Sequence, residues 1–473
     1  MKHWKMSQNL RNLHAGCLLA ALLIYTGSQI WQCVCWPPFY SFDETLEIDY
    51  VYQLTQGHLP TFFGGAEFNP LNMDYPYQVQ WRYQHPPLFY LIEAPIFLLF
   101  DTYARPIAGI WAMRALVGIL GVALILASAW TARWMFGKPC TASALVPLIV
   151  ASNRCLPSVV LNYTLASLWV TLLIGMTCKL IRLHTRISTC CSVAWIVIVM
   201  LAPLTRLSTI PIMGLCLLTM VVGMLMLRIR FLATWLLTIF LPALLAILSS
   251  VWFYLRLYAL SGSFTGSQPE WSAANLHRDT SKTFVEALLD PSFYVSSFAQ
   301  FQNSTVTTQS YGWIPVLVLT VFPLVIAAVL AIRHLSSMRL SMQWEPTLIA
   351  AMLCVALLGT VFQQLLFYKQ GGSGNAVYFS LISIVFAGII AYGFANLPRM
   401  RQFVVCGWML FRFAILMAEV LLNWPFRNGG TMAGRSIVWI GVTVFGLLLV
   451  SAGTAASCAV IARHRNQAIM PSI

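Results

Sequence analysis

Residues 107–130 read IAGIWAMRALVGILGVALILASAW, an apolar run interrupted by a single charged residue, Arg114. As a helix, this run is long enough to cross the roughly 30 Å hydrocarbon core of a bilayer. It lacks the alternation of polar and apolar residues that membrane β-strands require, and so does the run at 437–450. Because a helix satisfies its own backbone hydrogen bonds in lipid, these stretches predict transmembrane helices.

The whole chain shares this character. Of its 473 residues, 59% are hydrophobic and only 9% are charged, and the mean hydropathy is +0.76. Apolar stretches of about 20 residues recur along nearly the whole length. We therefore predict an all-α polytopic membrane protein, with one integral-membrane domain over residues 1–473 and no separate soluble domain.

Basic residues set the predicted topology. They collect in short clusters between the apolar stretches, for example at 133–138, 228–230 and 333–339, and short basic loops are typical of the cytoplasmic side. The net charge of +14 thus follows from topology, and we expect no nucleic-acid partner. The first apolar stretch is too long for a signal-peptide core and is expected to remain as an anchor. About 12 helices with both termini in the cytoplasm follow, near 16–36, 107–132, 141–153, 156–181, 190–204, 208–227, 231–251, 312–332, 346–367, 377–396, 402–423 and 436–460.

The apolar stretch Pro86–Phe100 is a special case. If it crossed the membrane, every later basic cluster would lie outside. It is short for a span, begins with two prolines and contains Glu93 and Pro95. We therefore expect a juxtamembrane or re-entrant helix at the outer face.

This topology leaves two long external loops, at residues 37–106 and 252–311. Twelve of the 14 acidic residues then lie outside or at the outer interface. Long loops of this kind usually carry function.

The first loop opens with a cluster of carboxylates, Asp43, Glu44, Glu47 and Asp49, in a chain that is otherwise poor in charge. Acidic groups gathered at a membrane face indicate a functional site. The alternative is that they only solvate the loop. Taken singly, Glu47, Asp49, Glu67 and Asp74 are better explained as solvated or ion-paired than as catalytic.

Several motifs resemble the GT-C superfamily of polyprenyl-phosphate-sugar-dependent glycosyltransferases, which includes protein O-mannosyltransferases and lipid A aminoarabinose transferases. The resemblance covers about residues 40–380. It rests on Phe42-Asp43-Glu44, Asp49-Tyr50, Gly57-His58-Leu59-Pro60, Gln84-His85-Pro86-Pro87-Leu88-Phe89-Tyr90, Trp252-Phe253-Tyr254-Leu255-Arg256 and Gly371-Gly372-Ser373-Gly374-Asn375-Ala376.

The resemblance implies roles for the acids. Transfer of a sugar from a lipid phosphate to a hydroxyl needs a base beside the acceptor and groups that stabilise the anionic leaving group. In the family, the first acid of the Asp-Glu pair is regarded as catalytic, which makes Asp43 the candidate base. Glu44 is expected to position the acceptor or Asp43.

The resemblance also implies that basic residues bind the phosphate of the donor. The candidates are Arg82, His85, Arg206, Arg256 and Lys369, and the alternative for each is an interfacial anchor or an ion-pair partner. Tyr83 and Asn375 are candidate substrate contacts, although Trp and Tyr are also common in interface belts. Arg114, inside a predicted span, is expected to form an internal ion pair.

Two departures from the family pattern stand out. Relatives read Asn-Asp where this chain has Asn162-Tyr163, and Asn-Ala-Arg-Tyr where it has Asn375-Ala376-Val377-Tyr378. These changes bear on donor or acceptor contacts, so the chain is either a divergent transferase or one that has lost activity.

The sequence therefore predicts a glycosyltransferase of the cell membrane. It would move a hexosyl or pentosyl group from a polyprenyl-phosphate donor to a glycan, lipid or protein acceptor on the outer side, with surrounding lipids as further partners. No zinc spacing and no nucleotide-type glycine loop occurs, so no cofactor is indicated and a divalent metal stays open. The alternatives are a transporter or flippase and a catalytically inactive accessory protein of the cell envelope.

Overall fold

The computed structural model describes residues 7–35, 38, 42–70, 78–156, 159–184, 188–276, 278–337, 344–397, 400–422 and 437–468. Every regular element in these ranges is a helix. Ten helices are long and apolar enough to cross a membrane, and three shorter apolar helices accompany them. The chain is a multi-pass membrane protein, as its composition predicted.

The long helices follow the predicted spans closely. They are α1 (Gln8–Cys35), α4 (Pro106–Met135), α6 (Tyr163–Arg182), α8 (Thr209–Met226), α9, η2 and α10 (Leu232–Trp235, Leu236–Phe240, Leu241–Ser261), α15, η3 and α16 (Trp313–Val316, Leu317–Val321, Phe322–Ser337), α17 (Trp344–Lys369), η4 and α18 (Ala376–Ile382, Ser383–Ala395), α19 (Arg401–Leu422) and α20 (Ile437–Ala468). The short helices α5 (Thr141–Ser152) and α7 (Thr189–Leu201) occupy two further predicted spans.

Four predicted boundaries differ from the helix ends by seven or more residues. Helix α1 begins at Gln8 instead of residue 16, and α20 ends at Ala468 instead of residue 460. Helix α6 begins at Tyr163 instead of residue 156, after a non-helical segment that follows α5. Helix α10 continues to Ser261, ten residues beyond the predicted end, because no helix breaker precedes Gly262. Gly262 adopts φ +69° and caps the helix in the left-handed conformation that glycine favours. Helical structure therefore occupies the first ten residues of the predicted loop 252–311.

The predicted juxtamembrane segment forms α3 (Leu88–Leu99). Its 12 residues form a helix about 18 Å long, the same length as α5. Helix α3 packs against α2 (Phe42–Thr55) and α4. The second long loop contributes α11 (Pro269–Leu276), α12 (Phe284–Leu289), α13 (Pro291–Ser297) and α14 (Ser304–Thr307).

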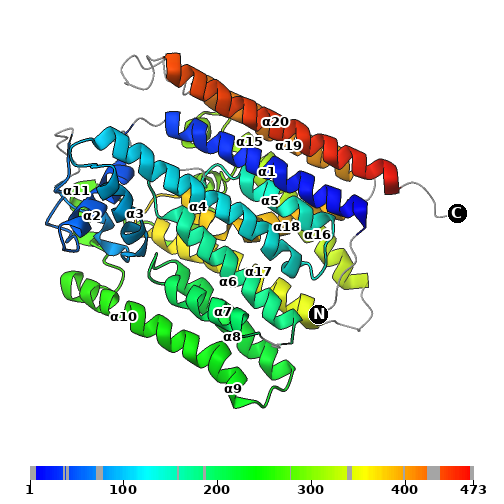
Figure 1. Cartoon of the computed structure of the whole chain (residues 1–473), viewed down its shortest axis with the longest axis horizontal. Helices are drawn as coiled ribbons and strands as arrows, with labels where there is room; N and C mark the ends of the chain where they lie inside the picture. The colour runs from blue at the N-terminus through cyan, green and yellow to red at the C-terminus, as the bar shows by residue number, and fades with distance from the viewer. Residues whose placement is uncertain are drawn as a thin grey trace.

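The helices form one elongated bundle (Figure 1). Helices α1 and α20 pack side by side along one face, where small residues allow close approach: a Cβ on Gly27 would lie 2.4 Å from the carbonyl oxygen of Gly446. Helix α10 lies at the opposite face, and α2, α3 and α11 gather at one end.

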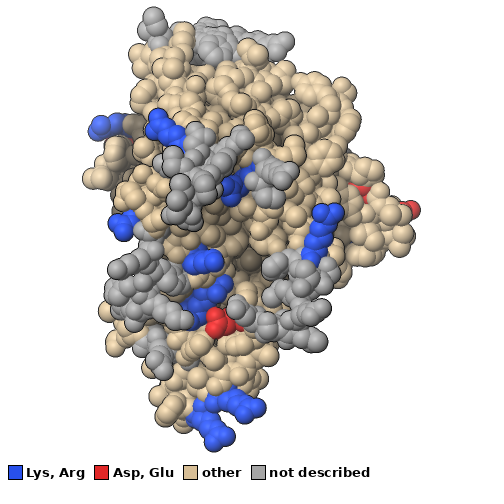
Figure 2. All heavy atoms as spheres, turned by 90° about the vertical axis from the view of Figure 1, so that its right-hand side faces the viewer, with Lys and Arg blue, Asp and Glu red and all other residues tan. Residues whose placement is uncertain are grey.

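The two ends of the bundle differ in charge. Figure 2 looks at the end away from α2 and α3, and Lys and Arg side chains are scattered over it with few acids. The chain enters α1 and leaves α20 towards this end (Figure 1). The acidic motif on α2 thus lies at the end opposite to these basic side chains, in the arrangement that the charge pattern predicted.

Candidate functional site

Helix α2 carries the acidic motif directly after α1. Asp43 and Glu44 occupy its first turn, where the positive end of the helix dipole stabilises carboxylates. Asp43 and Glu47 are one turn apart and share a face. The side chain of Asp43 is 51% exposed, whereas that of Glu47 is fully buried.

Arg82 lies between these two carboxylates. It belongs to the short helix η1 (Trp81–Gln84), and the Gln80 side chain caps this helix by accepting from the Arg82 backbone N–H at 2.9 Å. The guanidinium pairs with the Asp43 carboxylate, and its Nε lies 3.5 Å from Oε1 of Glu47. The predicted base and the first predicted phosphate ligand are therefore in direct contact.

His85 adjoins Arg82 but is not a cation. Its Nε2 lies 3.5 Å from Nη1 of Arg82, and the Tyr50 hydroxyl donates to its backbone carbonyl at 2.9 Å. Burial lowers the pKa of His85 well below its usual value, and the charges of Arg206 and Arg82 lower it further. The ring is therefore neutral. Because an arginine can only donate, Nε2 accepts and Nδ1 carries the ring proton.

Arg206 approaches the same cluster from the segment between α7 and α8. Its Nη1 donates to Oδ1 of Asn162 and its Nη2 to the hydroxyl of Tyr163, each at 2.6 Å. The guanidinium also stacks on the Tyr163 ring, 3.7 Å from the ring centroid. Tyr163, where relatives carry an acid, thus supplies a neutral acceptor to Arg206.

Tyr90 on α3 joins the two halves of the site. Its hydroxyl accepts from Nδ2 of Asn162 at 3.3 Å, and its ring stacks on Tyr50 with centroids 3.7 Å apart. Burial raises the pKa of the Tyr90 hydroxyl and the nearby Glu47 carboxylate contributes to this rise, but no hydrogen bond joins these two side chains. Tyr90 therefore connects Asn162 and Arg206 to Tyr50, which in turn binds the His85 carbonyl. We call Asp43, Glu47, Arg82, His85, Tyr90, Asn162 and Arg206 the Asp43 cluster.

Two buried carboxyls of α2 have raised pKa values. Burial raises the pKa of Glu47 to about 7, although Arg82 opposes the shift. Burial also raises the pKa of Asp49 to about 6, against hydrogen bonds from the backbone N–H groups of Phe68 and Glu67 and from the amides of Gln80 and Gln53. The backbone bonds are each 2.7 Å long. Asp49 therefore holds the following loop against α2. From the sequence, Asp49 was expected to be solvated or ion-paired, whereas it accepts hydrogen bonds from backbone and amide groups.

Glu44 points away from Asp43, into the bundle. Its carboxylate accepts from Nε of Arg114 at 2.7 Å and Nη2 at 2.5 Å, and from the backbone N–H of Val160 at 3.0 Å. The predicted internal ion pair of Arg114 is confirmed. Both side chains are at most 1% exposed, so Glu44 anchors α2 and makes no contact with an acceptor from this position.

The other predicted ligands lie outside the Asp43 cluster. Arg256 donates to the backbone carbonyls of Leu59 and Pro60 at 3.2 and 2.8 Å, and Lys369 is exposed at the end of α17. Asn375 caps η4 by accepting from the Val377 N–H at 3.0 Å.

Tyr83 also forms a contact within the protein. Its side chain is buried, and its hydroxyl donates to the carbonyl of Gly266 at 2.6 Å. It joins the two long loops, so the structure leaves its hydroxyl no role as a substrate contact.

The sequence analysis missed part of the Asp43 cluster. Glu47 was expected to be solvated or ion-paired, and it does pair with Arg82, but it was not expected in the site. Asn162 was noted only as a motif neighbour and Tyr90 only as part of the Gln84–Tyr90 motif. The spacing of Asp43 and Glu47 on one helical face is the signal that could have identified Glu47. Asp74 lies outside the described residues.

Two cavities accompany the bundle. One, of about 480 Å³, lies between α1, α4 and α20 and is lined mainly by apolar side chains, with Arg114, Gln29 and Cys33 among the polar groups. A smaller one lies between α1, α5, α19 and α20. Within the described ranges, no group of three or more His, Cys, Asp or Glu side chains is arranged to hold a metal ion.

No protein-family model matches the chain, and no curated protein matches it. Solved structures do share its fold. The archaeal oligosaccharyltransferase AglB from Archaeoglobus fulgidus, in complex with an inhibitory peptide and a dolichol-phosphate, is 12% identical with a TM-score of 0.50; the match covers 96% of this chain and 56% of AglB. ArnT from Cupriavidus metallidurans, bound to undecaprenyl phosphate, is 14% identical with a TM-score of 0.48, covering 94% of this chain and 77% of ArnT.

At these identities the likeness to AglB establishes the fold. The chain shares the membrane fold of AglB and spans a little over half of its length.

Proposed function

We propose that this protein transfers a sugar from a polyprenyl-phosphate donor to an acceptor hydroxyl at the outer face of the cell membrane. The observation that carries the proposal is the Asp43 cluster, in which a half-exposed carboxylate lies in contact with Arg82, beside neutral His85 and next to Arg206. The fold supports it, since AglB was solved with a dolichol-phosphate.

The residues suit a direct displacement. Asp43 takes the proton of the acceptor hydroxyl while the acceptor oxygen forms a bond to the anomeric carbon. The bond from that carbon to the phosphate oxygen breaks, and the electron pair leaves with the polyprenyl phosphate. Attack opposite the leaving group inverts the anomeric carbon.

Arg82 and Arg206 are the groups for the leaving phosphate, because guanidinium groups bind phosphate oxygens in a bidentate manner. Both are buried, at 8 and 9% exposure, which strengthens their field on a developing anion. His85 contributes a neutral donor. Arg256 and Lys369 would serve only after a rearrangement that brings them to the Asp43 cluster.

The apolar cavity of about 480 Å³ between α1, α4 and α20 suits part of the polyprenyl chain. Arg114 lines this cavity and pairs with Glu44, the residue that follows Asp43. A chain lying there would have its polar end close to the start of α2.

An in vitro transfer assay with polyprenyl-phosphate sugars tests the proposal. We expect turnover by the native protein and a loss of at least about 100-fold in kcat for Asp43→Asn, since removal of a general base costs roughly that much. Glu270→Gln, which changes an exposed acid of the second long loop, is the matched control and should retain full activity. Activity that survives Asp43→Asn would refute the role of Asp43 as the general base.

A second function, an inactive accessory protein, is favoured by one observation. Arg206 is already held by Asn162 and Tyr163, and Tyr163 replaces the acid that relatives carry. If no donor supports turnover but the protein still binds polyprenyl phosphate, the accessory function replaces the enzymatic one. Arg114 and Glu419, two ionisable residues within the spans, lend a transporter no support, because both are engaged in buried ion pairs.

A further inference from the structure

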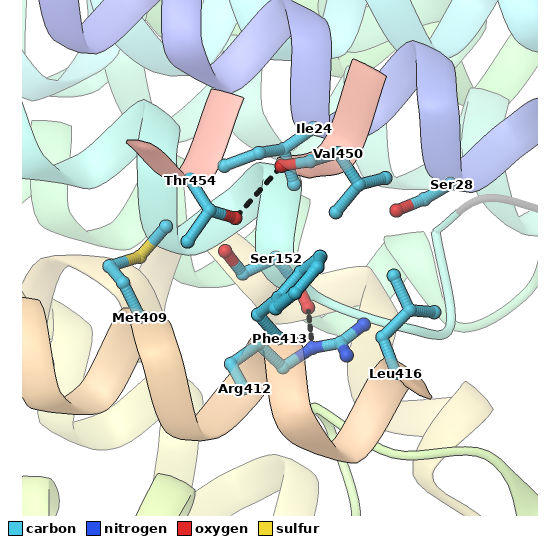
Figure 3. A pocket seen from close by; sticks show the side chains of 9 residues that line it. All are labelled: Ile24, Ser28, Ser152, Met409, Arg412, Phe413, Leu416, Val450 and Thr454. Carbon is cyan, nitrogen blue, oxygen red and sulfur yellow. Dashed lines mark hydrogen bonds between the residues drawn. The ribbon is translucent and has the colours of Figure 1, made fainter. Parts of the chain in front are cut away.

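A second cluster of buried charges lies apart from the Asp43 cluster, between α5, α19 and α14. Its charged members are Arg154, Arg412 and Glu419, with exposures of 3, 6 and 0%. Nε of Arg154 donates to Oε2 of Glu419 at 2.6 Å, and the backbone N–H of Asn303 donates to Oε1 at 2.8 Å. Nε of Arg412 donates to the carbonyl of Ser152 at 3.0 Å (Figure 3).

These bonds leave several donors unused. Nη1 and Nη2 of Arg154 and Nη1 of Arg412 are buried and have no hydrogen-bond partner among the described residues. A guanidinium cannot lose its proton in a protein, so these donors remain and their charge must be compensated. In an apolar membrane interior such unpaired groups are costly.

The charges of this cluster do not balance. Among the described residues, two arginines face one glutamate, which leaves one net positive charge in this part of the chain. The groups that interact electrostatically with Arg412 in the described part of the chain are Glu419, Arg154 and Cys155. Burial raises the pKa of the Cys155 thiol to about 12, so it stays neutral and supplies no counter-charge.

A cavity lies next to the unused donors. Arg412 lines it together with Ser28, Ser152 and Thr454, and Figure 3 shows the Arg412 guanidinium and the Ser28 hydroxyl pointing towards the same space. The space open to the centre of a water-sized particle is about 10 Å³, so the cavity admits one water molecule or one small ion. A phosphate, a carboxylate ligand or a lipid headgroup is too large for it.

We propose that this cavity binds one monovalent anion of the size of chloride. Nη1 of Arg412 is its main ligand and the Ser28 hydroxyl a second, while the charge of Arg154 adds to the attraction. The anion neutralises the excess charge and links α1 to α19. Its role is structural, and it does not depend on the proposed transferase activity.

The test uses the purified full-length protein in detergent, with chloride replaced stepwise by gluconate at constant ionic strength. We expect the melting temperature to rise by a few degrees with chloride and then to saturate, as for a ligand that binds only the folded state. Arg412→Met, which removes the charge but keeps a long side chain, should abolish this dependence. Arg230→Met, at an exposed loop arginine, should leave it unchanged.

Glu419→Gln should change the chloride dependence of the melting temperature in the direction opposite to Arg412→Met. It raises the net charge of the cluster, so the melting temperature should depend on chloride more steeply. If a variant fails to fold, crystals of the native protein grown with bromide should show an anomalous peak beside Nη1 of Arg412. A melting temperature that ignores chloride, a dependence that persists in Arg412→Met, or a water molecule alone at the site would overturn the proposal.

Discussion

At the scale of single residues, the Asp43 cluster is defined by one guanidinium between two carboxylates. Arg82 contacts an exposed acid, Asp43, and a buried one, Glu47. Exposure keeps Asp43 accessible to an acceptor, whereas burial favours the neutral form of Glu47. Two acids on one helical face therefore differ in exposure to solvent because their surroundings differ.

Glu47 makes stability depend on pH. Its pKa is about 7 in the folded protein and about 4.5 when unfolded, so the folded state binds more protons between these values. Stability should fall as the pH rises from about 4.5 to 7, by about 3 kcal/mol from this group. Glu47→Gln should remove most of the slope, measured as melting temperature against pH.

Asp49, with a pKa of about 6, should leave a smaller decline below pH 6 in the Glu47→Gln variant. Glu270→Gln is the control for an exposed acid and should show the slope of the native protein. An unchanged slope in Glu47→Gln would mean that Glu47 is ionised throughout this pH range.

At the scale of elements, α2 is held in place by its own acids. Glu44 binds Arg114 of α4, and Asp49 caps the backbone of the loop that leads to η1. That loop brings Arg82 back to the start of α2. The position of Asp43 relative to Arg82 thus depends on contacts that Asp43 itself does not make.

The Glu44–Arg114 pair should show strong coupling. Glu44→Gln leaves a buried guanidinium without a counter-ion, and we expect a loss of about 3–5 kcal/mol. The double variant Glu44→Met with Arg114→Met should be more stable than Glu44→Gln, since it leaves no buried charge. Melting temperatures of the single and double variants measure the coupling.

The control for this cycle is Glu67→Gln, which breaks the exposed contact between His58 and Glu67. A loss below about 1 kcal/mol is expected there. Similar losses for Glu44→Gln and Glu67→Gln would show that Arg114 finds another partner or solvent.

At the scale of the whole molecule, the bundle separates charge by end. The short basic loops lie at the end that Figure 2 shows, and α2 and α3 lie at the other. This separation is the physical basis for assigning the Asp43 cluster to the outer face.

Cysteine labelling tests that assignment. Tyr103 and Lys138 are both exposed, before and after the membrane-crossing part of α4. In intact cells an impermeant thiol reagent should label Tyr103→Cys and not Lys138→Cys, and permeabilised cells should label both. Because Cys190 and Cys354 are exposed, both should first be replaced by serine. Labelling of Lys138→Cys alone in intact cells would invert the topology.

The sequence by itself determined the fold class, the spans and the expectation that Arg114 forms an internal ion pair. The length of apolar segments and the position of basic loops are local properties on which insertion into a bilayer depends. It also singled out Asp43, Arg82 and Arg206. Only the tertiary structure decided which groups meet: it placed Glu47, Tyr90 and Asn162 in the cluster, made His85 neutral, and bound Arg256 and Asn375 to other backbone groups. Hydrogen-bond partners and burial depend on residues that are far apart in the chain, so local patterns encode them only in part, as in the shared helical face of Asp43 and Glu47.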